Sequence, residues 1–152
     1  MDSSAGGTLT GLIPALKAEW ARRLRDEPPL SALGRRDTIQ FLIEATLLQL
    51  VAMLPDPAGR PPARPPTPLV GPVFSYCACG LEPMRRYFAA GEATLRTVLG
   101  EKSGLEAGQV LPFLRELAER EARSLCQPCP RQGSTVCLLG ASSGGTGPAS
   151  SA

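Results

Sequence analysis

The chain has 152 residues, with 16 basic and 14 acidic side chains and no histidine. The net charge of +2 is too small to indicate binding to nucleic acid or to a membrane through bulk electrostatics. Without histidine the chain lacks the commonest general base, the Ser-His and Cys-His nucleophile pairs and every histidine-containing metal site, so we do not expect an enzyme.

The first predicted element is a helix over residues 12–26. Residues 1–11 are expected to be a flexible N-terminus, and they lack the basic and apolar regions of a signal peptide, which favours a cytoplasmic protein. Gly11 is the predicted N-cap, which places Pro14 in the first turn. An apolar stripe recurs every four residues and consists of Leu12, Leu16, Trp20 and Leu24, with Trp20 as a core anchor.

The second predicted helix covers residues 37–54. Asp37 with Gln40 at N3 fits a capping box, and Pro55 ends the helix. One apolar face consists of Ile39, Leu42, Ile43, Thr46, Leu50 and Leu54, and a second consists of Phe41, Ala45 and Leu48. A helix that is apolar on two faces is usually buried between neighbours, so we expect this to be the central helix. Its apolar run is too short to cross a membrane, which needs about 20 residues.

Residues 55–73 are rich in proline. Such a density of proline excludes a helix or a central strand. The segment is either a stiff linker between the second and third helices or a ligand for a domain that binds polyproline II. We favour the linker because such linkers are common.

The third predicted helix covers residues 81–99 and carries an apolar seam of Met84, Phe88, Gly91, Leu95 and Val98. A glycine in a helix costs about 1 kcal/mol relative to alanine, so Gly91 is expected where another helix approaches closely. Gly100 is a natural stop for this helix.

The fourth predicted helix covers residues 105–126. Ser103 and Glu106 form a capping-box pattern at its start, and Pro112 is expected to kink or restart the helix. Residues 131–152 are rich in Gly, Ser and Ala and are expected to be a disordered tail. The sequence therefore predicts an all-α four-helix bundle over residues 12–130.

Two cysteine pairs flank the third and fourth helices. Cys77 and Cys79 precede the third helix as Cys-x-Cys, and Cys126 and Cys129 end the fourth as Cys-x-x-Cys. Two helices joined by a short connection form an antiparallel hairpin, so the pairs are expected to converge. Four converging thiolates suit tetrahedral Zn²⁺. The same residues could instead hold an iron–sulfur cluster, form a reversible disulfide or remain unligated buried thiols.

Two segments resemble the helical N-terminal sensor domain of RsbR-type bacterial stress-signalling regulators. The first lies within residues 12–54 and contains Glu19-Trp20-Ala21-Arg22-Arg23-Leu24-Arg25. The second is Tyr87-Phe88-Ala89-Ala90-Gly91-Glu92-Ala93. The resemblance implies a helical bundle that senses a ligand or binds a protein. It carries over no functional residue, and the STAS output domain that follows such a sensor has no counterpart in this sequence.

Together these features predict a non-catalytic regulatory or adaptor bundle that binds a protein partner, with a four-cysteine metal site pinning its C-terminal hairpin. The alternative is a thiol-based redox sensor or metal-handling protein. The abundance of arginine, alanine, glycine and proline is typical of a GC-rich bacterial genome.

Overall fold

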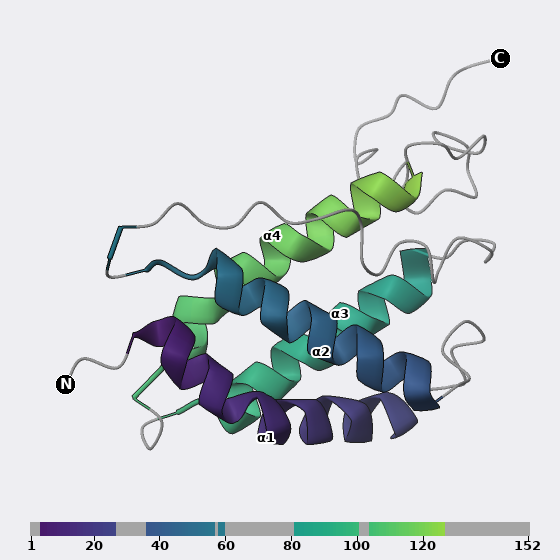
Figure 1. Cartoon of the computed structure of the whole chain (residues 1–152). Coiled ribbons are helices and arrows are strands. Elements are labelled where there is room, and N and C mark those ends of the chain that lie inside the picture. The colour runs from purple at the N-terminus through teal and green to yellow at the C-terminus, as the bar shows by residue number, and fades with distance from the viewer. Residues whose placement is uncertain (1–3, 27–35, 57, 60–80, 101–103, 127–152) are drawn as a thin grey trace, which may run out of the picture.

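Four helices make up almost all of the chain that the computed structural model describes (Figure 1). They are α1 (Ala5–Asp26), α2 (Arg36–Met53), α3 (Leu81–Val98) and α4 (Ala107–Cys126). The described residues are 4–26, 36–56, 58–59, 81–100 and 104–126. Within these ranges there is no strand, and one antiparallel bridge joins Gly100 to Leu105 between α3 and α4. The predicted all-α bundle is confirmed.

The direction of the helices explains the long connection in the middle of the chain. α1 contacts α2 and α3, and α4 contacts α3 and α2. In Figure 1, α1 and α4 run one way along the bundle and α2 and α3 run the other way. α2 therefore ends at the opposite end of the bundle from the start of α3, and the 18 residues of α2 span about 27 Å. The segment that joins them must return over that length, so a short turn could not replace it.

The start of α1 corrects a prediction. The helix begins at Ala5, not near residue 12, and Gly11 is an interior residue instead of the N-cap. Ser4 is the cap, since its Oγ accepts a hydrogen bond from the Gly7 N–H at 3.1 Å. Leu9 is fully buried, and the free energy gained by burying it stabilises the first turns of the helix despite their glycine residues. Residues 5–11, which were assigned to a flexible N-terminus, are therefore helical.

Both α1 and α4 contain a proline inside the helix. Pro14 is well within α1, which bends partway along its length in Figure 1, as helices often do at proline. α4 is continuous through Pro112 and does not restart there. Its N-cap is Glu106 and not Ser103, because the Gln109 side chain accepts a hydrogen bond from the Glu106 N–H at 2.9 Å. Ser103 itself lies outside the described residues.

The bounds of α2 and α3 agree with the predictions to within one residue. The helix α2 starts at Arg36, so Asp37 falls in the first turn, and its side chain is not among those described. Pro55 follows the last turn of α2 as expected. Beyond it, Gly59 has φ near 70°, and its N–H donates to the Asp56 carbonyl at 2.8 Å.

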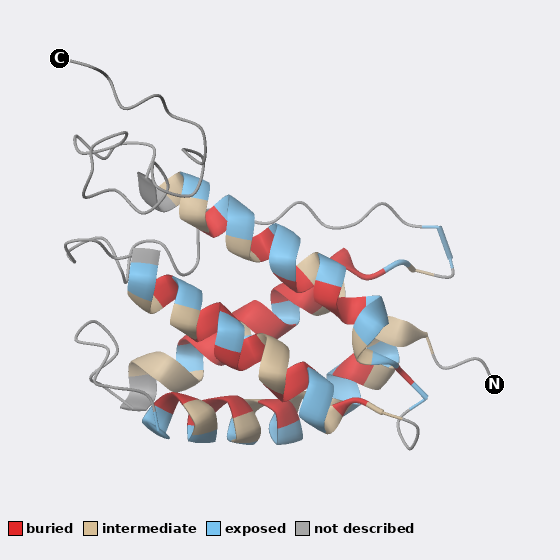
Figure 2. Ribbon diagram, turned by 180° about the vertical axis from the view of Figure 1, so that it is seen from behind, coloured by how far each residue is buried: buried red, intermediate tan, exposed pale blue. Residues whose placement is uncertain are grey.

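The buried residues lie on the sides of the helices that face one another (Figure 2). The stripe of α1 and the seam of α3 are buried as predicted, apart from partly exposed Leu12 and Val98. On α2 the first predicted face is buried apart from partly exposed Ile39, with Leu42, Ile43 and Leu50 at most 2% exposed. The second face is not, since Phe41 is 70% and Leu48 is 53% exposed. The prediction that α2 is buried on two faces is wrong: the helix packs on one side only.

A close contact between α1 and α3 organises the core. Trp20 is fully buried, and its Nε1–H donates to the carbonyl of Tyr87 at 3.0 Å. The ring centroids of Trp20 and Tyr87 are 4.9 Å apart. A Cβ atom on Gly91 would lie 2.5 Å from the Trp20 ring. The prediction that Gly91 stands where another helix approaches closely is confirmed.

Candidate functional site

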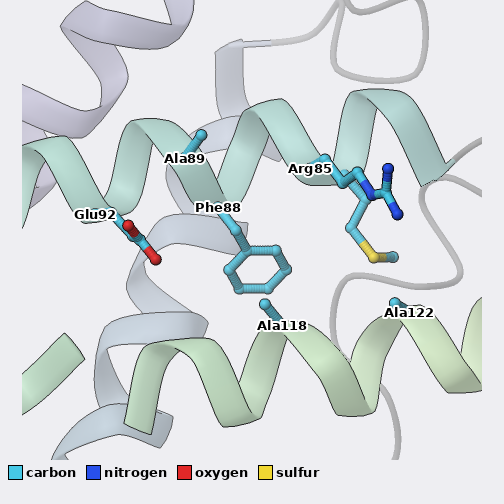
Figure 3. A pocket seen from close by; sticks show the side chains of 7 residues that line it. Arg85, Phe88, Ala89, Glu92, Ala118 and Ala122 are labelled. Carbon is cyan, nitrogen blue, oxygen red and sulfur yellow. The ribbon is translucent and has the colours of Figure 1, made fainter. Parts of the chain in front are cut away.

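An open groove lies between α3 and α4 (Figure 3). Its volume is about 280 Å³. Met84 and Phe88 of α3 line its floor and are buried, and Phe88 points toward Ala118 of α4. The other lining residues are Arg85, Ala89, Glu92 and Ala122. The groove is therefore apolar at its base and charged along one edge.

The groove exists because α4 presents small side chains opposite an aromatic ring. Ala118 and Ala122 are four residues apart and so lie on the same face of α4. Larger residues at these two positions would close the space beside Phe88. Next to them on α4, Leu114 and Leu117 are buried in the core, so the hollow is confined to the alanine positions.

The edge of the groove carries a charged residue on each side of Phe88. Arg85 and Glu92 lie two turns apart on α3, and Figure 3 shows them on either side of the ring. Glu92 accepts a hydrogen bond from Arg115 of α4 at 2.8 Å and lies 3.5 Å from Arg96. The bond to Glu92 raises the pKa of the Arg115 guanidinium, and it ties the two helices together at one end of the groove.

The hairpin that the cysteine hypothesis requires is present. α3 and α4 are antiparallel, and Met84 near the start of α3 and Ala122 near the end of α4 line the same groove. The N-terminus of α3 and the C-terminus of α4 therefore lie at the same end of the hairpin.

The cysteine side chains themselves are beyond what the structure describes. Cys77, Cys79 and Cys129 lie outside the described residues, and Cys126 is the last residue of α4 with an undescribed side chain. Among the residues that are described, no cluster of three or more His, Cys, Asp or Glu side chains could hold a metal ion. The four-cysteine site remains a prediction.

Sequence reasoning missed the groove. The available signal was the pair of alanines at i and i+4 on a helix that also buries larger residues, among them Leu114 and Leu117. Nothing in that pattern indicates that they face Phe88, since this depends on the register between the two helices.

Comparison with known proteins gives no relative for this chain. No protein family, no curated protein and no solved structure matches it. The resemblance to RsbR-type sensor domains therefore has no independent support, and function has to be inferred from the fold and the groove. No helix within the described ranges combines the length and the apolar character needed to cross a membrane.

Proposed function

We propose that the protein is a non-catalytic regulatory or adaptor bundle that binds a protein partner in the groove between α3 and α4. The observation that carries the proposal is the apolar floor of Met84 and Phe88 beside the small residues of α4. A volume of about 280 Å³ is at the lower limit for small-molecule sites, which are about 300–1,000 Å³. It suits one or two apolar anchor side chains of a partner segment better than a large cofactor.

The shape and the charges favour a helical segment of the partner. An amphipathic helix binds by placing apolar residues at i, i+3 or i+4 into a groove of this kind. Arg85 and Glu92 lie on the edge, beside the polar flank of such a segment, and Glu92 is also paired with Arg115. Edge charges of this kind contribute mainly to orientation and specificity.

Filling the groove should abolish this binding. Peptides selected from a phage-displayed library on the wild-type protein are expected to bind Ala118→Phe at least about 30-fold more weakly, the loss of one anchor worth about 2 kcal/mol. Fluorescence anisotropy with the selected peptides measures the change. Ala18→Phe makes the same substitution at an exposed position of α1 and should leave the affinity unchanged.

A second experiment on the same peptides tests the charged edge. Arg85→Glu is expected to disfavour peptides that present acidic residues beside the anchor.

Equal binding to wild type, Ala118→Phe and Ala18→Phe would contradict the proposed groove. So would a failure to select any peptide that competes for one common site.

A second candidate function rests on the antiparallel hairpin. Because the start of α3 and the end of α4 lie together, we propose that Cys77, Cys79, Cys126 and Cys129 share one Zn²⁺, with thiolates about 2.3 Å from the metal. Such an ion would hold the two helices together at the end of the hairpin opposite the α3–α4 connection. An iron–sulfur cluster or a reversible disulfide on the same residues would make the protein a redox sensor or metal-handling protein instead.

Metal analysis of protein purified under reducing conditions tests this candidate. One zinc per chain is expected, and Cys79→Ser and Cys126→Ser should each release it and lower the melting temperature. Cys137→Ser, at the cysteine outside the two pairs, is the matched control and should retain the metal. Zinc that resists mild oxidation indicates a structural site, and loss on oxidation indicates a sensor. Metal-free protein with unchanged melting in both variants would eliminate the site.

A further inference from the structure

α2 carries an apolar stripe on the side that faces away from the core. The α2 stripe consists of Phe41, Ala45, Leu48 and Ala52, whose spacing of four, three and four residues places them on one helix face. Phe41 is 70% exposed and Leu48 is 53% exposed, and these are the large hydrophobic residues most open to solvent in the described part of the chain. Exposed apolar surface of this kind commonly marks an interaction site.

The stripe can be removed from water without burying an unpaired charge. Between Thr38 and Leu54 the only charged residue in the sequence is Glu44. Its carboxylate lies 2.6 Å from the ammonium group of Lys17 on α1, at the edge of the stripe. Between Thr38 and Leu54, a partner that covers the stripe therefore meets a neutral surface edged by an ion pair, while Asp37 lies one turn before Phe41 at the end of the stripe.

We propose that the α2 stripe packs antiparallel against the α2 stripe of a second copy of this chain. The order of residue sizes supports this partner. Phe41 and Ala52 lie equally far on either side of the midpoint between Thr46 and Leu47, and so do Ala45 and Leu48. A two-fold axis at that midpoint places Phe41 against Ala52 of the second copy and Ala45 against its Leu48. Each large side chain then meets a small one, as close packing requires.

The charges are also complementary under this symmetry. An antiparallel two-fold brings the same edge of both helices together, so the two Glu44 carboxylates lie about 7.5 Å apart along the helix axis. Each carboxylate is accompanied by its own Lys17. The edge of the interface then holds two cations and two anions, which leaves no net repulsion.

The area of the stripe limits the strength of the dimer. α2 is 18 residues long, so its face measures about 27 Å by 10 Å. A stable complex usually buries about 800 Å² on each partner, which is considerably more. We therefore expect a reversible dimer with a dissociation constant on the order of 10–100 µM.

Sedimentation velocity of the full chain over a concentration series tests the proposal, with reducing agent present to prevent disulfide dimers. The wild-type protein should shift from monomer to dimer across the tens to hundreds of micromolar. Phe41→Glu places a charge in the stripe and should weaken association at least about 30-fold. Ala15→Glu, at an exposed position of α1, is the matched control and should associate like the wild type. Both changes are at exposed positions, so melting temperatures should stay close to that of the parent.

A swap of residue sizes tests the antiparallel register. Ala45→Leu alone and Leu48→Ala alone should each weaken the dimer, because one creates a clash and the other a cavity. The double variant exchanges the two sizes across the two-fold axis and should regain the wild-type affinity. A wild-type protein that stays monomeric, a dimer unaffected by Phe41→Glu, or a double variant weaker than both single variants would overturn the proposal. Dimerisation only after removal of residues 132–152 would also overturn it, because the tail would then be the occupant of the stripe.

Discussion

Replacing Gly91 with leucine should lower the free energy of unfolding by about 3 kcal/mol, the upper end of what overpacking usually costs. A Cβ atom alone would lie 2.5 Å from the Trp20 ring, closer than carbon atoms pack. Trp20 cannot withdraw, because it is fully buried and its indole N–H is bonded to the Tyr87 carbonyl. α1 and α3 would have to separate, and the melting temperature should fall by roughly 10 °C.

Gly11→Leu is the matched control for this change. Gly11 is also inside a helix, but a Cβ atom there would meet nothing within 4 Å. The substitution should therefore raise stability by about 0.5–1 kcal/mol through helix propensity alone. Urea unfolding can be followed by the fluorescence of Trp20, the single tryptophan of the chain. Similar melting of the two variants would show that α1 and α3 are not in close contact at Gly91.

The seam of α3 was predicted correctly and the second face of α2 was not, and the difference shows what periodicity can predict. The seam of α3 was predicted from its helical spacing, and the close approach at Gly91 was predicted because a glycine inside a helix is costly unless a neighbour needs the space. Trp20 of α1 occupies that space. The second face of α2 was predicted to be buried because Phe41 and Leu48 repeat with helical spacing. Periodicity shows which residues share a face, but whether a neighbour covers that face depends on the arrangement of all four helices.

The starts of α1 and α4 were misplaced for a similar reason. Gly6, Gly7 and Gly11 argue against a helix by propensity, and the burial of Leu9 outweighs them. Such tertiary burial is not visible in a local window of sequence. At α4 the sequence pattern offered Ser103 and Glu106 as a capping box, whereas the side-chain bond is made one turn later by Gln109.

The candidate site was predictable only in part. The antiparallel hairpin of α3 and α4 followed from helix lengths and a short connection, and it is confirmed. The groove was not predicted, because it depends on which residues of α4 stand opposite Phe88. Phe41 was predicted to be buried and is exposed. This difference between prediction and structure is what reveals the proposed dimer face, because large apolar residues are typical of the interior.

Tyr87 should make the protein unstable at high pH. Its side chain is fully buried, and its hydroxyl lies 2.8 Å from Oγ1 of Thr46. Because the Thr46 hydroxyl donates to the Leu42 carbonyl at 2.7 Å, the Tyr87 hydroxyl is the donor in its bond with Thr46. Burial raises the pKa of Tyr87 well above its ordinary value, and the carboxylate of buried Glu121 adds to this rise.

The direction of the pH effect follows from proton binding. An unfolded tyrosine loses its proton near pH 10. The folded protein keeps the proton to a higher pH, so above about pH 10 the unfolded state binds fewer protons than the folded state. The contribution of Tyr87 to stability is therefore complete below about pH 10 and is lost as the pH rises from there toward the folded pKa. Urea unfolding across this range should show a steep fall in the free energy of unfolding.

Tyr87→Phe separates the hydroxyl from the ring. At neutral pH the variant should lose about 1 kcal/mol, the usual net worth of one hydrogen bond, since Thr46 keeps its bond to Leu42. Above about pH 10 its stability should decline less than that of the wild type, because it has no proton to lose at this position. Thr46→Val removes the same hydrogen bond but keeps the buried phenol, and it should retain the steep alkaline decline. If the free energy of unfolding of the wild type and of Tyr87→Phe falls equally above pH 10, the Tyr87 hydroxyl is accessible to solvent. That result would contradict the full burial of Tyr87 between α2 and α3.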